Sequence, residues 1–332
     1  EMFYAALTHS DKAIMLPTGF KNEMELILEA GCALFGGMKA MAEKPRMIAL
    51  INTVSPLTLD ERMLDCLMLL AKYGQAAVLC PATMLGATGS LSMAGTIASG
   101  TAEALAGIVL AQMIRPGTPV VFGIQSTAAD LRGGITFACA APEGTLMQGF
   151  SANMGKFYGM PSRGGGCQTD APVINCQAGY ESMLTFSSAY RHGINLVMEA
   201  GGVMDSVNAT SFEKMVIDFE IMRQVKASFT PFEVNEETLN LEEIKEIGHS
   251  GSFVTADYTL ENYMDLYSPK VGSRNASGSD YFKESVDKEM ERLLKSYQDN
   301  PPVLDDEARA AAEKILAKSG MEPQEFEKIR SL

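Results

Sequence analysis

The sequence contains no tryptophan and only three histidines, and its six cysteines form no closely spaced pair. The histidines, His9, His192 and His249, are far apart along the chain. Zinc and similar ions are usually held by several histidine or cysteine ligands at short spacings, so we expect no metal bound by side chains. Without tryptophan, any aromatic cage for a cation has to use phenylalanine and tyrosine.

Positive charge is also scarce, with 27 lysines and arginines against 41 aspartates and glutamates, a formal net charge of -14. A nucleic-acid-binding protein needs a basic face, so this class is excluded.

No signal peptide is visible, and most cysteines lie in apolar runs, which favours a reducing cytoplasm. We see no apolar run long enough to span a bilayer. The closest, residues 96–114, is interrupted by polar side chains and is expected to be a buried helix.

Common catalytic motifs are missing too, since there is no Walker loop and no GxSxG elbow. Apolar runs at 46–52, 75–81, 119–124 and 195–200 alternate instead with helical patterns. Continuous apolar runs are typical of parallel strands that are covered on both faces. A doubly wound sheet is possible, but no GxGxxG follows the first strand. The pattern therefore favours an α/β fold of the (β/α)8 barrel type.

We expect the barrel to cover residues 1–230. Only six or seven strand–helix units are visible and the chain begins abruptly, so an N-terminal part of the barrel is expected to be missing. Residues 231–332 have a different character, with charged helical patterns at 235–246, 281–298 and 305–318. A polar stretch at 268–280 is expected to be a loop. This C-terminal helical extension should pack on the barrel.

The active site of a parallel barrel lies at the carboxyl ends of its strands. The polar side chains that follow each apolar run are therefore the candidate site. Among them, Glu199 and Asp170 are the candidate catalytic residues. The candidate substrate-binding residues are Gln125, Arg132, Phe137, Glu143, Gly166, Thr169, Tyr180 and Asp205.

Each candidate also has a purely structural interpretation. Asp170 or Asp205 could cap a helix or a turn. Glu199 follows an apolar strand, where a carboxylate must be paired or hydrogen-bonded. Its partner could be structural, with Arg132 or Arg163 as the expected cation.

The glycine run at 164–166 is either a tight bulge or a place where the backbone approaches a ligand closely. The aromatic side chains also have two interpretations. They could surround a quaternary ammonium group, or they could be part of the hydrophobic core. The aromatic candidates are Phe122, Phe137, Phe150, Tyr158 and Tyr180.

Several long segments are distinctive when taken together. They are residues 87–123, ADLRGG at 129–134, Pro-Glu-Gly at 142–144, QAGYE at 177–181, and 205–220. These segments resemble the trimethylamine methyltransferase family. The resemblance implies a barrel enzyme that moves a methyl group from a methylated amine to Co(I) on a separate corrinoid protein. The corrinoid (cobalamin) would then be carried by that cognate partner and not held tightly by this chain. Family habit also implies a homo-oligomer.

The founding trimethylamine enzyme of the family carries pyrrolysine in its barrel. The corresponding region here, near residues 167–171, contains only ordinary amino acids. The sequence therefore resembles the non-pyrrolysine branch, which includes glycine betaine methyltransferases, and this implies a quaternary amine as methyl donor. Two alternatives stay open: a homologue that binds a quaternary amine without turnover, and another barrel enzyme such as a lyase or aldolase. A lysine at a strand end would favour the latter, and none of those considered has one.

Overall fold

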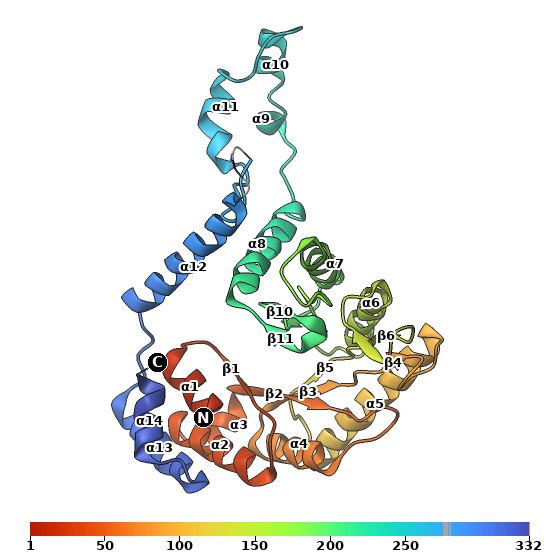
Figure 1. Cartoon of the computed structure of the whole chain (residues 1–332), viewed down its shortest axis with the longest axis vertical. Coiled ribbons are helices and arrows are strands. Elements are labelled where there is room, and N and C mark those ends of the chain that lie inside the picture. Colours follow the sequence, from red (N-terminus) through yellow and green to blue (C-terminus); the bar gives the residue numbers. More distant parts are fainter. Residues whose placement is uncertain (275–277, 279, 332) are drawn as a thin grey trace.

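The computed structural model describes residues 1–274, 278 and 280–331, and its centre is a curved parallel sheet (Figure 1). Four strands lie side by side in chain order. They are β1 (Ile14–Leu16), β2 (Met47–Asn52), β3 (Ala76–Cys80) and β5 (Val120–Phe122). All neighbouring pairs are parallel. The expected strands at 46–52, 75–81 and 119–124 are thus confirmed.

Two further parallel strands continue this order. β8 (Arg163–Gly165) pairs with β9 (Leu196–Met198), and a bridge between Phe122 and Ser162 connects β5 to the start of β8. The expected strand at 195–200 is therefore also confirmed. Helices separate successive strands along the chain and lie outside the curve of the sheet (Figure 1). They are α2 (Lys21–Leu34), α3 (Met38–Glu43), α4 (Glu61–Tyr73), α5 (Met93–Ile114), α6 (Pro142–Phe157) and α7 (Cys176–His192), and α8 (Phe212–Ser228) follows the last strand.

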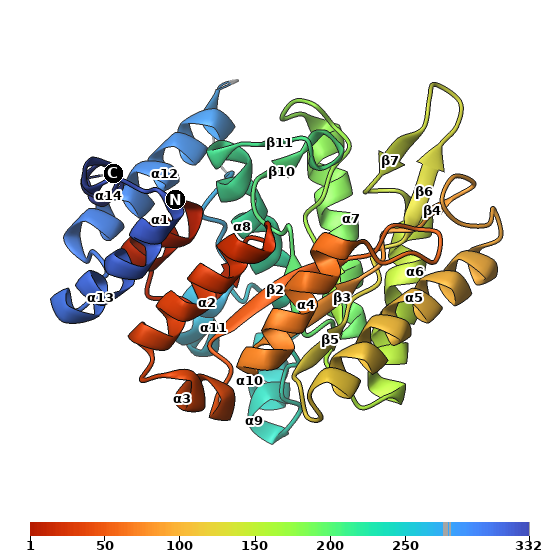
Figure 2. The same ribbon diagram turned by 90° about the horizontal axis from the view of Figure 1, so that it is seen from below.

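Two small additional sheets lie at the carboxyl ends of the parallel strands (Figure 2). β4 (Met84–Leu85), β6 (Thr127–Asp130) and β7 (Thr136–Ala138) form one three-stranded sheet, in which β7 runs antiparallel to β6. The strand at 136–138 is not a unit of the parallel sheet. It is the return strand of a hairpin, because Gly133 and Gly134 turn the chain back. β10 (Val203–Met204) and β11 (Ala209–Thr210) form a second hairpin around the 3-10 turn η1 (Asp205–Val207).

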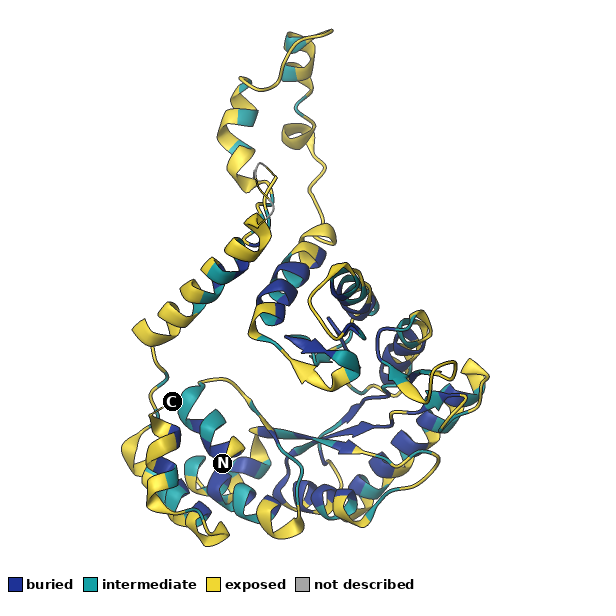
Figure 3. Cartoon of the chain, viewed as in Figure 1, coloured by how far each residue is buried: buried dark blue, intermediate teal, exposed yellow. Residues whose placement is uncertain are grey.

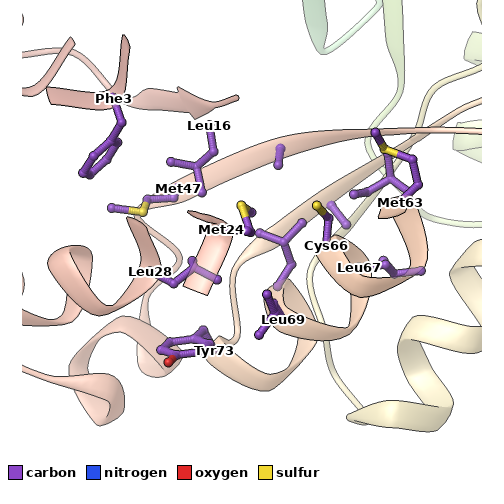
Figure 4. Packing of buried hydrophobic residues seen from close by; sticks show 14 of the residues in the cluster. Phe3, Leu16, Met24, Leu28, Met47, Met63, Cys66, Leu67, Leu69 and Tyr73 are labelled. Carbon is purple, nitrogen blue, oxygen red and sulfur yellow. The ribbon is translucent and has the colours of Figure 1, made fainter. Parts of the chain in front are cut away.

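The core lies between the sheet and the helices that cover it (Figure 4). Helix α4 illustrates why the sequence folds this way. The Asp60 side chain accepts from the Met63 amide at 2.8 Å and begins the helix, and Gly74 ends it in the left-handed region. Its apolar side chains recur three or four residues apart, so Met63, Leu67 and Leu70 are all buried.

Helix α5 is the one described helix that is long and apolar enough to cross a membrane by length and composition, which corrects the expectation that no such run exists. It nevertheless packs against α4, α6 and β3. Its Glu103 side chain is buried and accepts hydrogen bonds from Thr53 Oγ1, from Ser55 Oγ at 2.8 Å and from the Leu57 amide at 2.8 Å. These contacts fix the loop after β2. Only 33% of the most apolar stretch of α5 is buried, so the helix covers the sheet with one face and is not the buried helix that was expected.

The C-terminal part returns to the start of the chain. The helices α12 (Tyr281–Asp299), α13 (Asp306–Leu316) and α14 (Pro323–Arg330) pack against α8, α2 and α1 (Met2–His9), respectively. The helices α9 (Glu236–Leu239), α10 (Leu241–Ile247) and α11 (Asp257–Asn262) project away instead (Figure 1). The expected loop at 268–280 contains no helix or strand in its described residues, and 275–277 and 279 lie outside them.

We expect Glu103→Ala to lower the free energy of unfolding by about 3 kcal/mol, because two hydroxyls and a backbone amide lose a buried charged acceptor. Chemical denaturation monitored by circular dichroism measures this change. Glu291→Ala on the exposed face of α12 is the matched control and should change stability by less than about 0.5 kcal/mol. Equal effects of the two substitutions would contradict the anchoring role of Glu103.

Candidate active site

Arg163 lies at the centre of a polar cluster at the carboxyl ends of the parallel strands. Its side chain is 2% exposed, and each of the five N–H groups of the guanidinium has an acceptor. Nε contacts the Met198 sulfur at 3.3 Å, and Nη1 contacts the Cys80 sulfur at 3.3 Å and the Gln125 side-chain oxygen. Nη2 donates to both carboxylate oxygens of Glu199, at 2.5 and 2.6 Å. A buried charge needs this degree of pairing.

Two amides close the cluster into a ring. Gln125 Nε2 donates to Gln168 Oε1 at 3.0 Å, and Gln168 Nε2 donates to Glu199 at 3.4 Å. The ring thus runs from Arg163 through Gln125 and Gln168 to Glu199 and back to Arg163. We call these four residues the strand-end ring. It contains one positive and one negative charge, so its net charge is zero.

The backbone around the ring is held in unusual conformations. Glu199 has φ of 52° and Cys167 has φ of 51°, both in the left-handed region that L residues rarely adopt. Such strain persists only where the surroundings enforce it, and it is often found at functional sites. Gly165 is required for space, because a Cβ there would lie 2.3 Å from the Gln168 oxygen and 2.7 Å from the Gln125 nitrogen. The glycine run therefore lets side-chain amides reach the backbone.

A second buried ion pair holds the loops that carry the ring. Lys214 and Asp218 on α8 are completely buried and lie 2.5 Å apart. Lys214 Nζ donates to the Cys167 carbonyl at 3.1 Å, and Asp218 Oδ2 accepts from the Gly202 amide at 2.8 Å. One helix therefore fixes the segment before Gln168 and the segment after Glu199. Burial raises the pKa of Asp218 to about 6, although Lys214 and the Gly202 amide act in the opposite direction.

Asp170 occupies a junction between loops. Its carboxylate accepts from the Cys139 amide at 2.9 Å, from the Ala140 amide at 3.2 Å and from Ser206 Oγ at 2.8 Å. The neighbouring Thr169 is fully buried and donates to Glu181 at 2.6 Å. This geometry favours the turn-capping interpretation of Asp170, because both of its oxygens already serve loop groups. A direct role in catalysis stays a prediction.

The structure brings together only some of the predicted site residues. Gln125 and Glu199 meet in the strand-end ring, and Arg163, one of the two expected partners of Glu199, pairs with it. The Gly166 amide pairs with the Met198 carbonyl at 3.1 Å. Arg132 is exposed in the β6–β7 hairpin, where its amide bonds to Asp130.

Four other predicted residues lie farther out. Phe137 is half-buried in β7, and Glu143 is exposed in the first turn of α6. Tyr180 is exposed on α7. Asp205 begins η1, and its amide bonds to the Ala171 carbonyl at 3.0 Å.

The five aromatic candidates come from different helices and strands and differ in burial, so they do not form a cage in this structure. Phe122 is fully buried in β5, whereas Phe150, Tyr158 and Tyr180 are exposed on α6 or at its end and on α7. A small polar cavity of about 20 Å³ touches Gln125, Gln148, Gly165 and Gln168. It has room for about one water molecule and is too small for a methylated amine.

Gln168 is the main residue of the ring that the sequence pattern did not indicate. It directly follows Cys167, and the polar list for this strand end began one residue later, at Thr169. Gln148 was missed as well, and it donates to the Gly165 carbonyl at 2.6 Å. It lies inside a helix, where a strand-end rule cannot find it. The sequence signal that could have found Gln168 is a glutamine close to the glycine run at 164–166.

The cysteine side chains near the strand-end ring are unreactive thiols. Burial raises the pKa of the Cys80, Cys139 and Cys167 thiols, so they remain protonated at neutral pH. In the described part of the chain, no group of three His, Cys, Asp or Glu side chains is placed to hold a metal ion.

A sheet of parallel strands with helices between them and a neutral ionic ring at the strand ends defines an α/β protein with an enzyme-like site. The sequence profile of the trimethylamine methyltransferase (MTTB) family matches residues 1–322, so the chain belongs to this family of methyltransferases.

Individual relatives are also named as amine methyltransferases. The glycine betaine methyltransferase of Desulfitobacterium hafniense strain Y51 is 36% identical over 329 residues, which are 97% of this chain and 68% of that protein. The trimethylamine methyltransferase MttB of Methanosarcina barkeri strain Fusaro is 32% identical over 276 residues, 81% of this chain and 55% of that protein. The chain thus spans between about half and two thirds of the length of these relatives.

The raised pKa of Asp218 predicts a specific pH dependence. Between the ordinary value of 3.8 and about 6, the folded state binds more protons than the unfolded state. This contribution to stability is therefore complete below pH 3.8 and is lost as the pH rises through 6. Relative to the Lys214→Met Asp218→Leu double variant, the natural chain should gain stability as the pH falls from 7 to 4.5, by roughly 1.4 kcal/mol per unit of pKa difference.

Denaturant titrations of both proteins at several pH values measure this difference. The exposed pair Lys283–Asp287 on α12 has the same spacing, so Lys283→Met Asp287→Leu is the control. It should change the pH dependence much less, because both charges stay hydrated. A pH-independent difference for the buried pair would contradict the assigned pKa.

Proposed function

We propose that the chain transfers a methyl group from a quaternary amine of the glycine betaine type to the Co(I) corrinoid of a partner protein. The observation that carries this proposal is the neutral strand-end ring in a member of the trimethylamine methyltransferase family. The similarity to a glycine betaine methyltransferase along 97% of the chain supports the choice of donor.

The proposed scaffold is a (β/α)8 barrel, and the strand order supports it. Six parallel strands follow one another in chain order, and a helix lies between successive strands. In such barrels the reaction takes place at the carboxyl ends of the strands. The strand-end ring lies at this end, and we infer that it forms the floor of the substrate site.

The charge of the donor accounts for the absence of an obvious acid. A quaternary nitrogen carries a permanent positive charge, so the C–N electron pair can leave with nitrogen when Co(I) attacks the methyl carbon. The product is a neutral tertiary amine, and no proton is transferred. The protein has to orient the C–N bond and exclude water. It should not hold the cation too tightly, because this charge disappears in the transition state.

The ring offers a carboxylate to the cationic end of the donor. Glycine betaine has one positive and one negative charge, and the ring provides a group for the positive charge only. Glu199 is 20% exposed, so it can face the ammonium group. Arg163 has no donor left over, and its role is then to orient Glu199 and Gln125 instead of binding the substrate carboxylate itself. That carboxylate needs other donors, and Arg132 and backbone N–H groups near Gly166 remain candidates.

The loops at the strand ends provide a surface for the corrinoid partner. Several apolar side chains there are about half exposed or more. They are Leu57, Leu91, Leu131, Ile135, Val173 and Val207. We call these six residues the apolar rim, and the loops that carry most of them lie at one end of the molecule (Figure 2). A clustered apolar rim around a polar site is typical of a protein-docking surface. We propose that this encounter takes place in the cytoplasm.

The first test is turnover with Co(I) cobalamin. We expect demethylation of glycine betaine and no demethylation of trimethylamine, which is mostly protonated at neutral pH and lacks an activated nitrogen. Glu199→Gln keeps the size of the side chain and removes its charge, so kcat/KM should fall about 10- to 100-fold while the protein still folds. Glu291→Gln is the control and should behave like the natural chain. Turnover of trimethylamine alone would overturn the proposed donor.

The second test concerns the apolar rim. Leu131→Asp together with Ile135→Asp should raise KM for the methyl-accepting corrinoid protein about tenfold, because charges replace two exposed apolar side chains of the rim. The rate with free cobalamin should stay the same. Leu294→Asp together with Val303→Asp is the control, because these exposed residues lie outside the rim. Loss of both reactions in the rim variant would argue against a docking role.

A further inference from the structure

Residues 230–266, which we call the arm, form a segment that does not pack on its own chain. It contains α9, α10, α11 and the 3-10 turn η2 (Tyr263–Asp265), and none of these elements contains a buried residue. Figures 1 and 3 show it projecting from the body, and most of its residues are coloured as exposed in Figure 3. Within the described residues, the hydrogen bonds of 231–266 stay inside the segment, such as that from the Tyr258 amide to Glu243.

The arm is far too apolar for a free surface. Twelve large apolar side chains between 232 and 266 are exposed, and five of them exceed two thirds exposure. These five are Phe232, Val234, Val254, Met264 and Leu266. Together the twelve present an area on the order of 1,000 Å², more than the ~800 Å² that each partner contributes to a standard interface. Exposed apolar surface of this extent marks a contact surface.

The arm is also strongly acidic. Residues 230–266 contain nine aspartates and glutamates and one lysine, Lys245. Such a segment is repelled by an anionic membrane or by nucleic acid. Its partner surface should therefore be both apolar and basic.

The body of the same chain carries a surface of this kind. The last turns of α6, α7 and α8 contain Lys156, Arg191 and Lys226, all exposed, and Arg115 caps α5. The turns that follow α4, α5, α6 and α7, at 74–75, 115–119, 158–162 and 193–195, contain no acidic residue. Because each of these helices runs back to the amino end of the next strand, their last turns gather at one end of the sheet.

Apolar side chains accompany these charges. Met113, Phe157, Tyr190 and Phe229 are all at least 40% exposed at the ends of α5, α6, α7 and α8. Tyr190 already contacts Phe229 with ring centroids 5.5 Å apart, so the apolar surface continues to the root of the arm. We call this surface the basic end.

We propose that the arm of one copy of this chain packs on the basic end of a second copy. One chain carries both the arm and the basic end. The arm is negatively charged and the basic end is positively charged, and both surfaces also expose apolar side chains. Exchange of identical segments between copies is a common route to a closed oligomer. The arm begins where α8 ends, beside the basic end, so two copies can exchange arms reciprocally about a two-fold axis. This contact lies at the opposite end of the sheet from the strand-end ring and leaves the apolar rim free.

The full chain should therefore sediment as a dimer or a larger oligomer. The triple variant Phe232→Ser Val254→Ser Met264→Ser should fold and raise the dissociation constant at least about 100-fold. Leu91→Ser Ile135→Ser Val303→Ser removes three equally exposed apolar side chains elsewhere and should leave the assembly unchanged. Sedimentation velocity and light scattering measure the mass without any turnover, so the outcome is independent of the proposed methyl transfer.

Charge exchange tests the identity of the two surfaces. Glu236→Lys Glu237→Lys Glu246→Lys in the arm, and Lys156→Glu Arg191→Glu Lys226→Glu at the basic end, should each weaken self-association. Mixing these two variants should restore a hetero-oligomer through the exchanged charges. A natural chain that is monomeric at its solubility limit would overturn the proposal. So would an oligomer that survives the triple arm variant, or variants that fail to associate when mixed.

Discussion

The guanidinium of Arg163 is buried among the ends of the parallel strands, and a buried cation is stable only when its donors are all engaged. Five acceptors on four residues meet this requirement, and they come from β3, β9 and the segment after β5. This one constraint therefore fixes the spacing of strands that are distant in sequence. It also aligns Glu199 and Gln125, so the geometry of the proposed substrate site depends directly on it.

Buried carboxylates hold the surrounding loops in the same way. Glu103 fixes the loop after β2, Asp170 joins the loops before α6 and around η1, and Asp218 with Lys214 fixes the segments beside the ring. Each carboxylate accepts from backbone amides, and such amides need acceptors wherever a loop is buried. The high acidic content thus has a structural use at the strand ends. On the arm the acidic side chains are solvent-exposed, where we propose a role in association.

Much of the fold follows from apolar patterning, because covered parallel strands must be continuously apolar. Residues 46–52 and 75–81 are strands to within one residue. Pairing across the sheet is harder to foresee. Arg163 and Glu199 are 36 residues apart, and nothing local distinguishes Arg163 from Arg132 as the partner. The β6–β7 hairpin and Gln168 were missed because they depend on tertiary contacts and not on periodicity.

The central claim is that Glu199 recognises the positive charge of a zwitterionic donor. Calorimetric titration with glycine betaine and with 3,3-dimethylbutanoate tests it most directly, because the two have the same shape and carboxylate but only the first carries a cation. The natural chain should bind glycine betaine at least about tenfold more tightly, a difference of about 1.4 kcal/mol, and Glu199→Gln should abolish most of this preference. Equal affinities in the natural chain, or a preference that persists in the variant, would contradict the account.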